Sequence, residues 1–210
     1  MMLYEKYFTS EVASIFPTPI YLSPLGRNLT DSELKFVDKN KKQTYKNEGN
    51  LTSNNNYVLN EKPFKDLKLH LDLRVTDYFN KVICPNNEVT PYITQSWLNY
   101  TEKKQYHHKH SHPNSLVSGV LYLNSDEKFD RILFFKDTYP GIVFETKNYN
   151  LWNSHSWYIP VKTGDIVMFP SSLTHMVETK EGDNTRISLA FNVFVKGKIG
   201  INNKLTELFL

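Results

Sequence analysis

The spacing of apolar residues changes once along the chain, near residue 90. Before it, apolar positions recur every three or four residues, which is the period of an α-helix. This spacing predicts a helix whose buried positions are Phe64, Leu67, Leu71, Val75, Tyr78 and Val82. Pro63 falls in the first turn, where proline is tolerated, and Pro85 ends the helix.

A second, earlier helix is predicted by a capping signal. Thr30 is followed three residues later by Glu33, the pattern of a capping box. We expect the helix to run to about Asn47, with Leu34 and Val37 on its buried face. Ahead of it, residues 16–22 (FPTPIYL) read as a short strand, and their two prolines confine it to the edge of a sheet.

From residue 91 onward the period is two, the period of β-strands. Apolar or alternating runs cover residues 92–100, 115–124, 131–136, 156–161, 165–170 and 185–195. Residues 162–165 (KTGD) predict a hairpin turn between two of them. No helical pattern interrupts the runs, so we expect a mainly β protein with an antiparallel sandwich or barrel. We expect residues 1–210 to form one domain, in which residues 1–90 pack on a β core formed by residues 91–200.

Composition narrows the classes further. The 210 residues are 40% apolar, and this apolar fraction excludes a disordered chain. The formal charge of +3 is too small to indicate a nucleic-acid partner. No apolar stretch is long enough to span a membrane, and the first 16 residues lack the apolar core of a secretory signal. A single cysteine, Cys84, favours a reducing cytoplasm.

Four histidines lie within six residues: His107, His108, His110 and His112. On a strand, residues i and i+2 project from the same face, so His110 and His112 can converge on one metal ion. His175, which follows the run 165–170 and a short turn, is the candidate for a third ligand. The alternatives are a polar loop for the cluster and a buried core histidine for His175.

Arg186 lies eleven residues after His175, in a run whose alternation places Arg186, Ser188 and Ala190 on one face. A guanidinium on the inner face of a strand is costly unless an anion meets it. Arginine binds a carboxylate through two parallel hydrogen bonds, and Ser188 can add another. The alternative is an ion pair with an acid elsewhere in the core.

His-x-His, a distant His and then Arg-x-Ser resembles the pattern of the Fe(II)/2-oxoglutarate-dependent oxygenases. The segments IFPTPIY, SWLNY, HSHPNSLVSGVLYLN, GDIVMFPSSLTHMV and RISLAFN extend this resemblance to the putative 2OG-Fe(II) oxygenase family of bacteria and phages. The resemblance covers residues from about 15 to 200. It implies a double-stranded β-helix (jelly-roll, cupin-like) and a dioxygenase, an oxidoreductase that uses Fe(II), 2-oxoglutarate and O₂, acting as a hydroxylase.

Carried over by residue, the resemblance makes His110, His112 and His175 the iron ligands. It makes Arg186 the partner of the distal carboxylate of 2-oxoglutarate, with Ser188 assisting.

The resemblance also adds two cosubstrate contacts. Asn99 precedes His110 by eleven residues, as does an asparagine that contacts 2-oxoglutarate in related dealkylating oxygenases. Those enzymes carry a tyrosine two positions later, where this chain has Thr101. Tyr122 is a further candidate contact, and the alternative for it is plain core packing.

One departure from the wider superfamily keeps other readings open. Most members have Asp or Glu where this chain has His112, so both charges of Fe(II) stay uncancelled. The rivals are a three-histidine cupin-type dioxygenase that does not use 2-oxoglutarate and a non-catalytic cupin-like module that holds a metal. His108 with His110 is a second candidate ligand pair.

The substrate is not named by the sequence. We expect a small molecule or a peptide; nucleic acid is less favoured, because the lysines near the site read as a solvated face. Residues 137–156 form a long connection of the kind that acts as a lid, with Tyr139, Tyr149 and Trp152 as candidate substrate contacts.

Overall fold

The computed structural model describes residues 10–136 and 141–210, and within them the strands form two facing antiparallel sheets. The large sheet has the order β1-β9-β6-β11-β4-β3-β2, with β12 paired to β11. Its strands are Tyr21–Pro24 (β1), Thr44–Lys46 (β2), Leu51–Ser53 (β3), Val89–Thr101 (β4), Val117–Asn124 (β6), Asp165–Pro170 (β9), Arg186–Ile199 (β11) and Leu208–Phe209 (β12).

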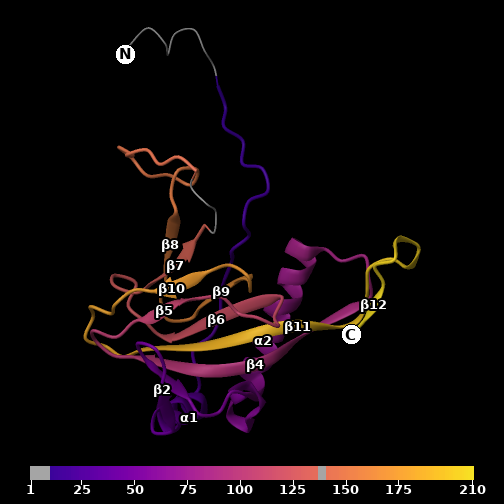
Figure 1. Ribbon diagram of the computed structural model, residues 1–210. Helices are drawn as coiled ribbons and strands as arrows, with labels where there is room; N and C mark the ends of the chain where they lie inside the picture. The colour runs from indigo at the N-terminus through magenta and orange to yellow at the C-terminus, as the bar shows by residue number, and fades with distance from the viewer. Residues whose placement is uncertain (1–9, 137–140) are drawn as a thin grey trace.

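The small sheet has the order β5-β10-β7-β8 and lies over one face of the large sheet (Figure 1). Its strands are His107–His110 (β5), His175–Val177 (β10), Arg131–Phe135 (β7) and Ser156–Pro160 (β8). This is the double-stranded β-helix that the sequence predicted. β1 pairs only with β9 and so lies at an edge of the large sheet as expected, but it begins four residues after Pro17.

The helices cover the opposite face of the large sheet (Figure 1). They are Asp31–Lys41 (α1) and Lys65–Tyr78 (α2), with short 3₁₀ turns at Val58–Asn60 (η1), Lys62–Phe64 (η2) and Asn202–Lys204 (η4) and a π-helical turn at Phe79–Ile83 (η3). The two long helices therefore pack outside the β core and leave its interior to the site.

The helix α1 begins as predicted and ends early. The Thr30 hydroxyl accepts from the Glu33 N–H, and the Glu33 carboxylate accepts from the Thr30 N–H. The helix stops at Lys41 rather than near Asn47, because β2 begins at Thr44. Val37 is buried as expected, whereas the expectation for Leu34 was wrong, since 46% of it is exposed.

The helix α2 has the expected buried face, except at its end. Five of the six expected positions are buried: Phe64, Leu67, Leu71, Val75 and Tyr78. Val82 is 38% exposed. The last turn is a π-helix, whose wider turn shifts the side chains out of phase with the preceding α-helix.

Two apolar cores result. The larger one fills the space between the helices and the large sheet and includes Leu71, Leu98 and Phe191. The smaller one, which we term the intersheet core, consists of Tyr122, Ile132, Phe134, Val161, Val167 and Phe169.

One predicted turn connects differently from what we expected. Residues 162–165 do turn, and the Asp165 N–H donates to the Lys162 carbonyl over 3.1 Å. The flanking strands β8 and β9 belong to different sheets, so the turn passes between sheets and does not close a hairpin. Among the described residues, no helix is long and apolar enough to cross a membrane.

Candidate metal centre and cosubstrate cavity

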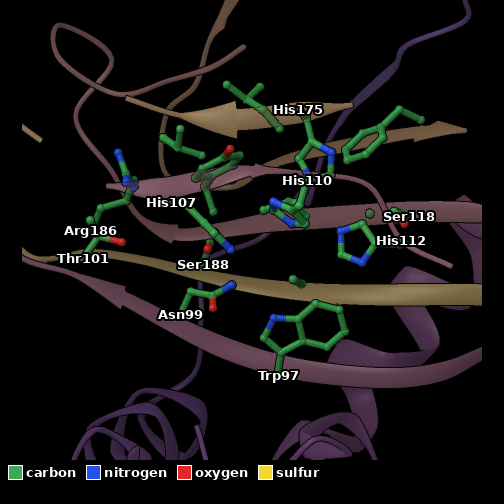
Figure 2. Close-up of a pocket in the computed structure, with 17 residues that line it drawn as sticks. Trp97, Asn99, Thr101, His107, His110, His112, Ser118, His175, Arg186 and Ser188 are labelled. Atoms are coloured by element: carbon green, nitrogen blue, oxygen red, sulfur yellow. The ribbon is translucent and has the colours of Figure 1, made fainter. Parts of the chain in front are cut away.

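Three of the predicted ligands come together between the sheets. His110 of β5 and His175 of β10 are direct cross-strand partners, with ring centroids 4.4 Å apart. His112 lies just beyond the end of β5, where its N–H donates to the Ser171 carbonyl over 2.9 Å. One ligand nitrogen from each of the three lies within 4.8 Å of the others. Figure 2 shows the three rings at one end of a cavity.

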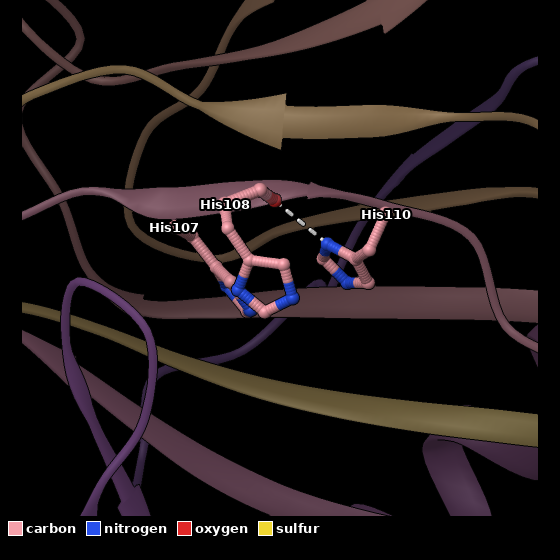
Figure 3. Close-up of side chains that lie close together, drawn as sticks. All are labelled: His107, His108 and His110. Carbon is pink, nitrogen blue, oxygen red and sulfur yellow. Dashed lines mark hydrogen bonds between the residues drawn. The ribbon is translucent and has the colours of Figure 1, made fainter.

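Backbone carbonyls orient two of the rings. Nδ1 of His110 lies 2.8 Å from the His108 carbonyl oxygen (Figure 3), and Nδ1 of His175 lies 3.0 Å from that of Leu173. A carbonyl can only accept, so each Nδ1 carries the proton and each Nε2 keeps its lone pair. Metal-binding histidines are oriented in this way, through the nitrogen that does not bind the metal.

Burial keeps these rings neutral. Burial, together with the neighbouring His110, lowers the pKa of His175 to about 3 and that of His112 to about 4. The pKa of His110 is also lowered, chiefly by burial. Neutral imidazoles are the form that binds metal, so the donor set fits a divalent cation at neutral pH.

The second candidate set, His107, His108 and His110, is also close enough to hold a metal. An irregularity in the pairing of β5 with β10, between the His110 and His107 positions, lets both of these side chains face the cavity. His108 does not line the cavity, and its Nδ1 lies 3.4 Å from the Glu48 carbonyl oxygen. Figure 3 shows this set. Only the first set places all three of its rings on the cavity.

The other end of the cavity is built on the large sheet. Arg186 of β11 is paired with Thr101 of β4, and two residues along, Ser188 is paired with Asn99 on one side and Tyr122 on the other. The four predicted cosubstrate residues are therefore neighbours on one sheet face, and all line the cavity.

The environment of Arg186 contains the core ion pair that was one of the two alternatives from the sequence. Its Nη1 donates to the Asp130 carboxylate over 3.1 Å, and both side chains are buried. Its Nη2 is buried and has no hydrogen-bond partner within residues 10–136 and 141–210. A buried N–H without an acceptor costs about 1–3 kcal/mol. The arginine thus has a core ion pair and still needs an acceptor on the cavity side.

Asn99 and Tyr122 are both buried against the cavity. The Asn99 carbonyl oxygen accepts from the Thr52 hydroxyl over 3.0 Å, so the amide N–H₂ is the part left for a ligand. Burial raises the pKa of Tyr122, and the phenol stays neutral. Tyr122 also belongs to the intersheet core, so its side chain packs in that core and lines the cavity as well.

The cavity itself is narrow, with a volume of about 30 Å³, room for about one water molecule. The His107 ring lines it between Arg186 and the other histidines (Figure 2). That ring stacks on His110, with centroids 4.7 Å apart. A keto acid therefore requires the lining side chains to move.

A wider groove opens beside the histidines. It has a volume of about 600 Å³ and meets the cavity at His112 and Trp97. Its lining is rich in amide, hydroxyl and aromatic side chains: Tyr45, Thr52, Asn56, Tyr57, Thr94, Gln95, Trp97, His112, Pro113, Asn114 and Asn192. No Asp, Glu, Lys or Arg is among these described lining residues.

The described part of the long connection between β7 and β8, residues 141–155, contributes no lining residue to either space. Tyr149 and Trp152 are exposed and line neither the cavity nor the groove, and Tyr139 lies outside the described residues. Sequence reasoning missed Asp130 and Lys180, which lie behind Arg186, because each is a single charged residue in a polar segment. Trp97 could have been found, since strand alternation places it on the face of Asn99.

The comparisons with known proteins agree with this geometry. Residues 95–192 match the family described as putative 2OG-Fe(II) oxygenase. No curated protein matches the chain.

Solved structures of low sequence identity share the fold. An oxidoreductase of the 2OG-Fe(II) oxygenase family from Burkholderia pseudomallei has a TM-score of 0.54 and 15% identity, with 83% of each chain covered. HygX from Streptomyces hygroscopicus, with nickel, 2-oxoglutarate and hygromycin B bound, has a TM-score of 0.52 and 13% identity, covering 84% of this chain and 82% of HygX. A Trichoplax adhaerens prolyl hydroxylase in complex with a hypoxia inducible factor peptide fragment has a TM-score of 0.55 and 15% identity, with 83% of each chain covered.

All seven residues predicted for the site lie within the matched segment. The part of the chain that forms the cavity is therefore the part that is similar to the putative 2OG-Fe(II) oxygenase family.

Proposed function

We propose that this protein is an Fe(II)- and 2-oxoglutarate-dependent oxygenase that hydroxylates an uncharged polar substrate, a small molecule or a peptide segment. One observation carries the cosubstrate part of the proposal. The buried Arg186 lines the cavity whose other end holds three neutral imidazoles, and its Nη2 has no hydrogen-bond partner among the described residues. A molecule with a carboxylate at one end and a metal-binding group at the other satisfies both.

Each end of the cavity then has a defined task. His110, His112 and His175 would hold iron, with the carbonyl-bound Nδ1 atoms of His110 and His175 directing Nε2 inward. Bound iron, together with 2-oxoglutarate and O₂, supplies the oxidising chemistry of the class. Arg186 and Ser188 would bind the distal carboxylate, and the Asn99 amide would donate to the same molecule.

The side chains around the cavity also exclude water. Ile132 and Phe169 line it from the intersheet core. The His107 ring makes no hydrogen bond to the described residues, so it is the lining group that can turn away at least cost. We propose that His107 moves aside when the keto acid enters.

The open groove beside His112 is the proposed substrate site. Its amide and hydroxyl groups can donate and accept hydrogen bonds, and Trp97 and Tyr57 offer flat apolar faces. A strongly charged ligand would find no opposite charge on the lining described above. HygX was solved with hygromycin B and the Trichoplax enzyme with a peptide, so substrates of both sizes occur on this fold. The lack of cations in the groove argues against nucleic acid.

The three-histidine cupin reading gives no role to Arg186. A cupin dioxygenase without a keto acid, or a module that only holds a metal, would leave the Nη2 group buried without an acceptor. We propose the cytoplasm as the location, since the exposed Cys84 has no disulfide partner.

Succinate formation tests the proposal. Protein loaded anaerobically with Fe(II) should, in air with ascorbate, convert 2-oxoglutarate slowly to succinate, and faster with a substrate from a panel of uncharged peptides and glycosides. O₂ consumption that depends on such a substrate but not on 2-oxoglutarate would favour the cupin reading. Metal binding with neither activity and no 2-oxoglutarate binding would favour the non-catalytic module.

A further inference from the structure

Behind Arg186, away from the cavity, lies a buried cluster of three charged side chains. One carboxylate, Asp130, lies between two cations: Arg186 Nη1 is 3.1 Å from its Oδ1, and Lys180 Nζ is 3.4 Å from both of its oxygens. Asp130 and Lys180 side chains are completely buried, and that of Arg186 is 4% exposed. Of the three, only Arg186 lines the cavity.

The backbone holds this cluster rigidly. The Asp130 carboxylate also accepts from the Asp126 N–H over 2.8 Å. Lys180 is fixed by backbone bonds to the segment after β4, through its N–H to the Gln105 carbonyl and its carbonyl to the Lys104 N–H. Its ammonium group donates to Asn184 Oδ1 over 2.8 Å in addition to Asp130. All three protons of the ammonium group are thus used within the cluster, and Lys180 has none left for a ligand.

The formal charges in the cluster do not balance, and the imbalance has a consequence. With Asp130 and Arg186 alone, the buried pair would be neutral and would attract an anion only weakly. Lys180 adds a second cation to the same carboxylate, so the cluster keeps one positive charge. Arg186 is the member of the cluster that lines the cavity, and its buried Nη2 has no hydrogen-bond partner among the described residues, so we infer that the charge is available to a ligand there.

We propose that Lys180 makes Arg186 selective for an anionic ligand. Lys180 neutralises the charge of Asp130, so Asp130 can orient the Arg186 guanidinium without cancelling the positive charge that binds the distal carboxylate. This inference rests on the proposed function, since it concerns the cosubstrate of the same cavity. Lys180 is a positioning residue and acts only through Arg186.

Other acids near Lys180 do not take over this role. The Glu102 carboxylate is paired with Lys41 at 2.7 Å, and that of Asp183 with Lys103 at 2.6 Å. Both acids are more exposed than Asp130, at 41% and 89% of their side chains. Water screens exposed charges far more than buried ones, so Asp130 remains the partner that sets the charge of the cluster.

The test is anaerobic calorimetric titration of the Mn(II)-loaded protein with 2-oxoglutarate and with 2-oxopentanoate, which has the same keto-acid end but no distal carboxylate. Lys180→Met leaves the cluster neutral, and we expect 2-oxoglutarate to bind about tenfold more weakly. Affinity for 2-oxopentanoate should stay unchanged, because that ligand does not reach Arg186 with a charge. Lys103→Met is the matched control, since it removes a lysine from an exposed ion pair nearby, and it should change neither affinity.

A double variant distinguishes the loss of a charge from damage to the fold as the cause of weaker binding in Lys180→Met. Asp130→Asn with Lys180→Met removes one charge of each sign, so Arg186 keeps a neutral acceptor and the cluster keeps its single positive charge. We expect this variant to bind 2-oxoglutarate within about threefold of wild type, tighter than Lys180→Met alone.

Three outcomes would overturn the inference. They are wild-type affinity for 2-oxoglutarate in a folded Lys180→Met protein, a double variant that is folded but no better than Lys180→Met, and an equal loss of affinity for both keto acids. If wild-type protein binds 2-oxopentanoate and 2-oxoglutarate equally, or neither, then the proposed function itself fails and the inference with it.

Discussion

The two ends of the cavity differ in charge: the side chains at one end are neutral, and those at the other end are ionised. The histidine end is held mainly by the small sheet and is neutral, because burial keeps the pKa of His112 and His175 near 4 and 3. The arginine end is held by the large sheet and contains buried formal charges on Asp130, Lys180 and Arg186.

This difference follows from what each end has to bind. A metal brings its own charge, so neutral donors with free lone pairs suffice. A carboxylate brings a negative charge that must be taken out of water, so the protein must supply a positive one there. Four sets of substitutions test this comparison, and we give them from the largest expected effect to the smallest.

Removing a ligand at the neutral end should have the largest effect. His175→Ala and His112→Ala should each lower the affinity for Fe(II) or Mn(II) by 100-fold or more, since even the groups that orient metal ligands are worth about 10–100-fold. Anaerobic titration with Mn(II) measures this. His108→Ala is the matched control and should bind nearly as wild type. Loss of affinity in His108→Ala, with none in His112→Ala, would show that the second histidine set holds the metal.

Arg186→Ala should remove the charged end and leave the metal in place. Truncating one partner of a buried charge-assisted contact costs roughly 2–5 kcal/mol, so 2-oxoglutarate should bind at least about 30-fold more weakly. Arg186→Lys should recover little, because an ammonium group cannot make the two parallel hydrogen bonds. Calorimetry of the Mn(II)-loaded protein measures both affinities. Unchanged 2-oxoglutarate affinity in Arg186→Ala would refute the keto-acid reading.

Glu33 tests whether stability can be separated from both ends. Burial raises the pKa of Glu33, but hydrogen bonds from Arg27 and Thr30 outweigh it and hold the pKa below its usual range. The folded state therefore binds this proton more weakly than the unfolded state does. The contribution to stability is present above the ordinary glutamate pKa and is lost as the pH falls through the folded-state value.

Glu33→Gln should accordingly lower the free energy of unfolding by about 1–3 kcal/mol at neutral pH, and less in acid. Urea denaturation at a series of pH values measures the difference. Asp31→Asn, in the same helical turn but exposed, is the control. Neither variant should change the affinity for metal or keto acid. A deficit that is constant with pH would mean that the ionised carboxylate of Glu33 is not the source.

His107→Ala should have the smallest effect, because the ring lies between the two ends and belongs to neither. Removing the ring widens a cavity that has room for only about one water molecule. 2-Oxoglutarate should therefore bind equally well or a few-fold more tightly. Metal affinity should not change. Weaker 2-oxoglutarate binding in this variant would make His107 a ligand contact rather than a side chain that moves aside.

The neutral end and the anchor could be predicted from sequence because their residues lie at short, regular spacings. His110 with His112, and Arg186 with Ser188, are two apart, and alternation along an extended segment fixes their common direction. His175 could be named as a third ligand from its place after the run 165–170 and a short turn, and the family resemblance supported it, but its cross-strand pairing with His110 was not predicted. The cluster behind Arg186 could not be predicted, because Asp130 and Lys180 are 50 residues apart and meet only through the tertiary fold.

The fold shows the same limit. Periodicity gave the longer strands of both sheets but not the short strands β2, β3, β10 and β12. The turn at residues 162–165 looks identical whether it closes a hairpin or passes between sheets. The end of α1 was overestimated because a competing strand pairing, β2 with β3, begins at Thr44 and Ser53. Local sequence does not determine which distant strand a segment pairs with.

Because the two ends of the cavity lie on different sheets, the separation of the sheets determines the length of keto acid that fits between them. The distance between the candidate metal ligands and Arg186 depends on how far apart the sheets are. We propose that the intersheet core sets that separation with side chains such as Phe134, which does not line the cavity. The length of keto acid that fits is thereby fixed by packed hydrocarbon rather than by any polar group. A chain adapted to a shorter or longer dicarboxylate would keep every ligand and anchor described here and differ in the volume of residues that touch neither.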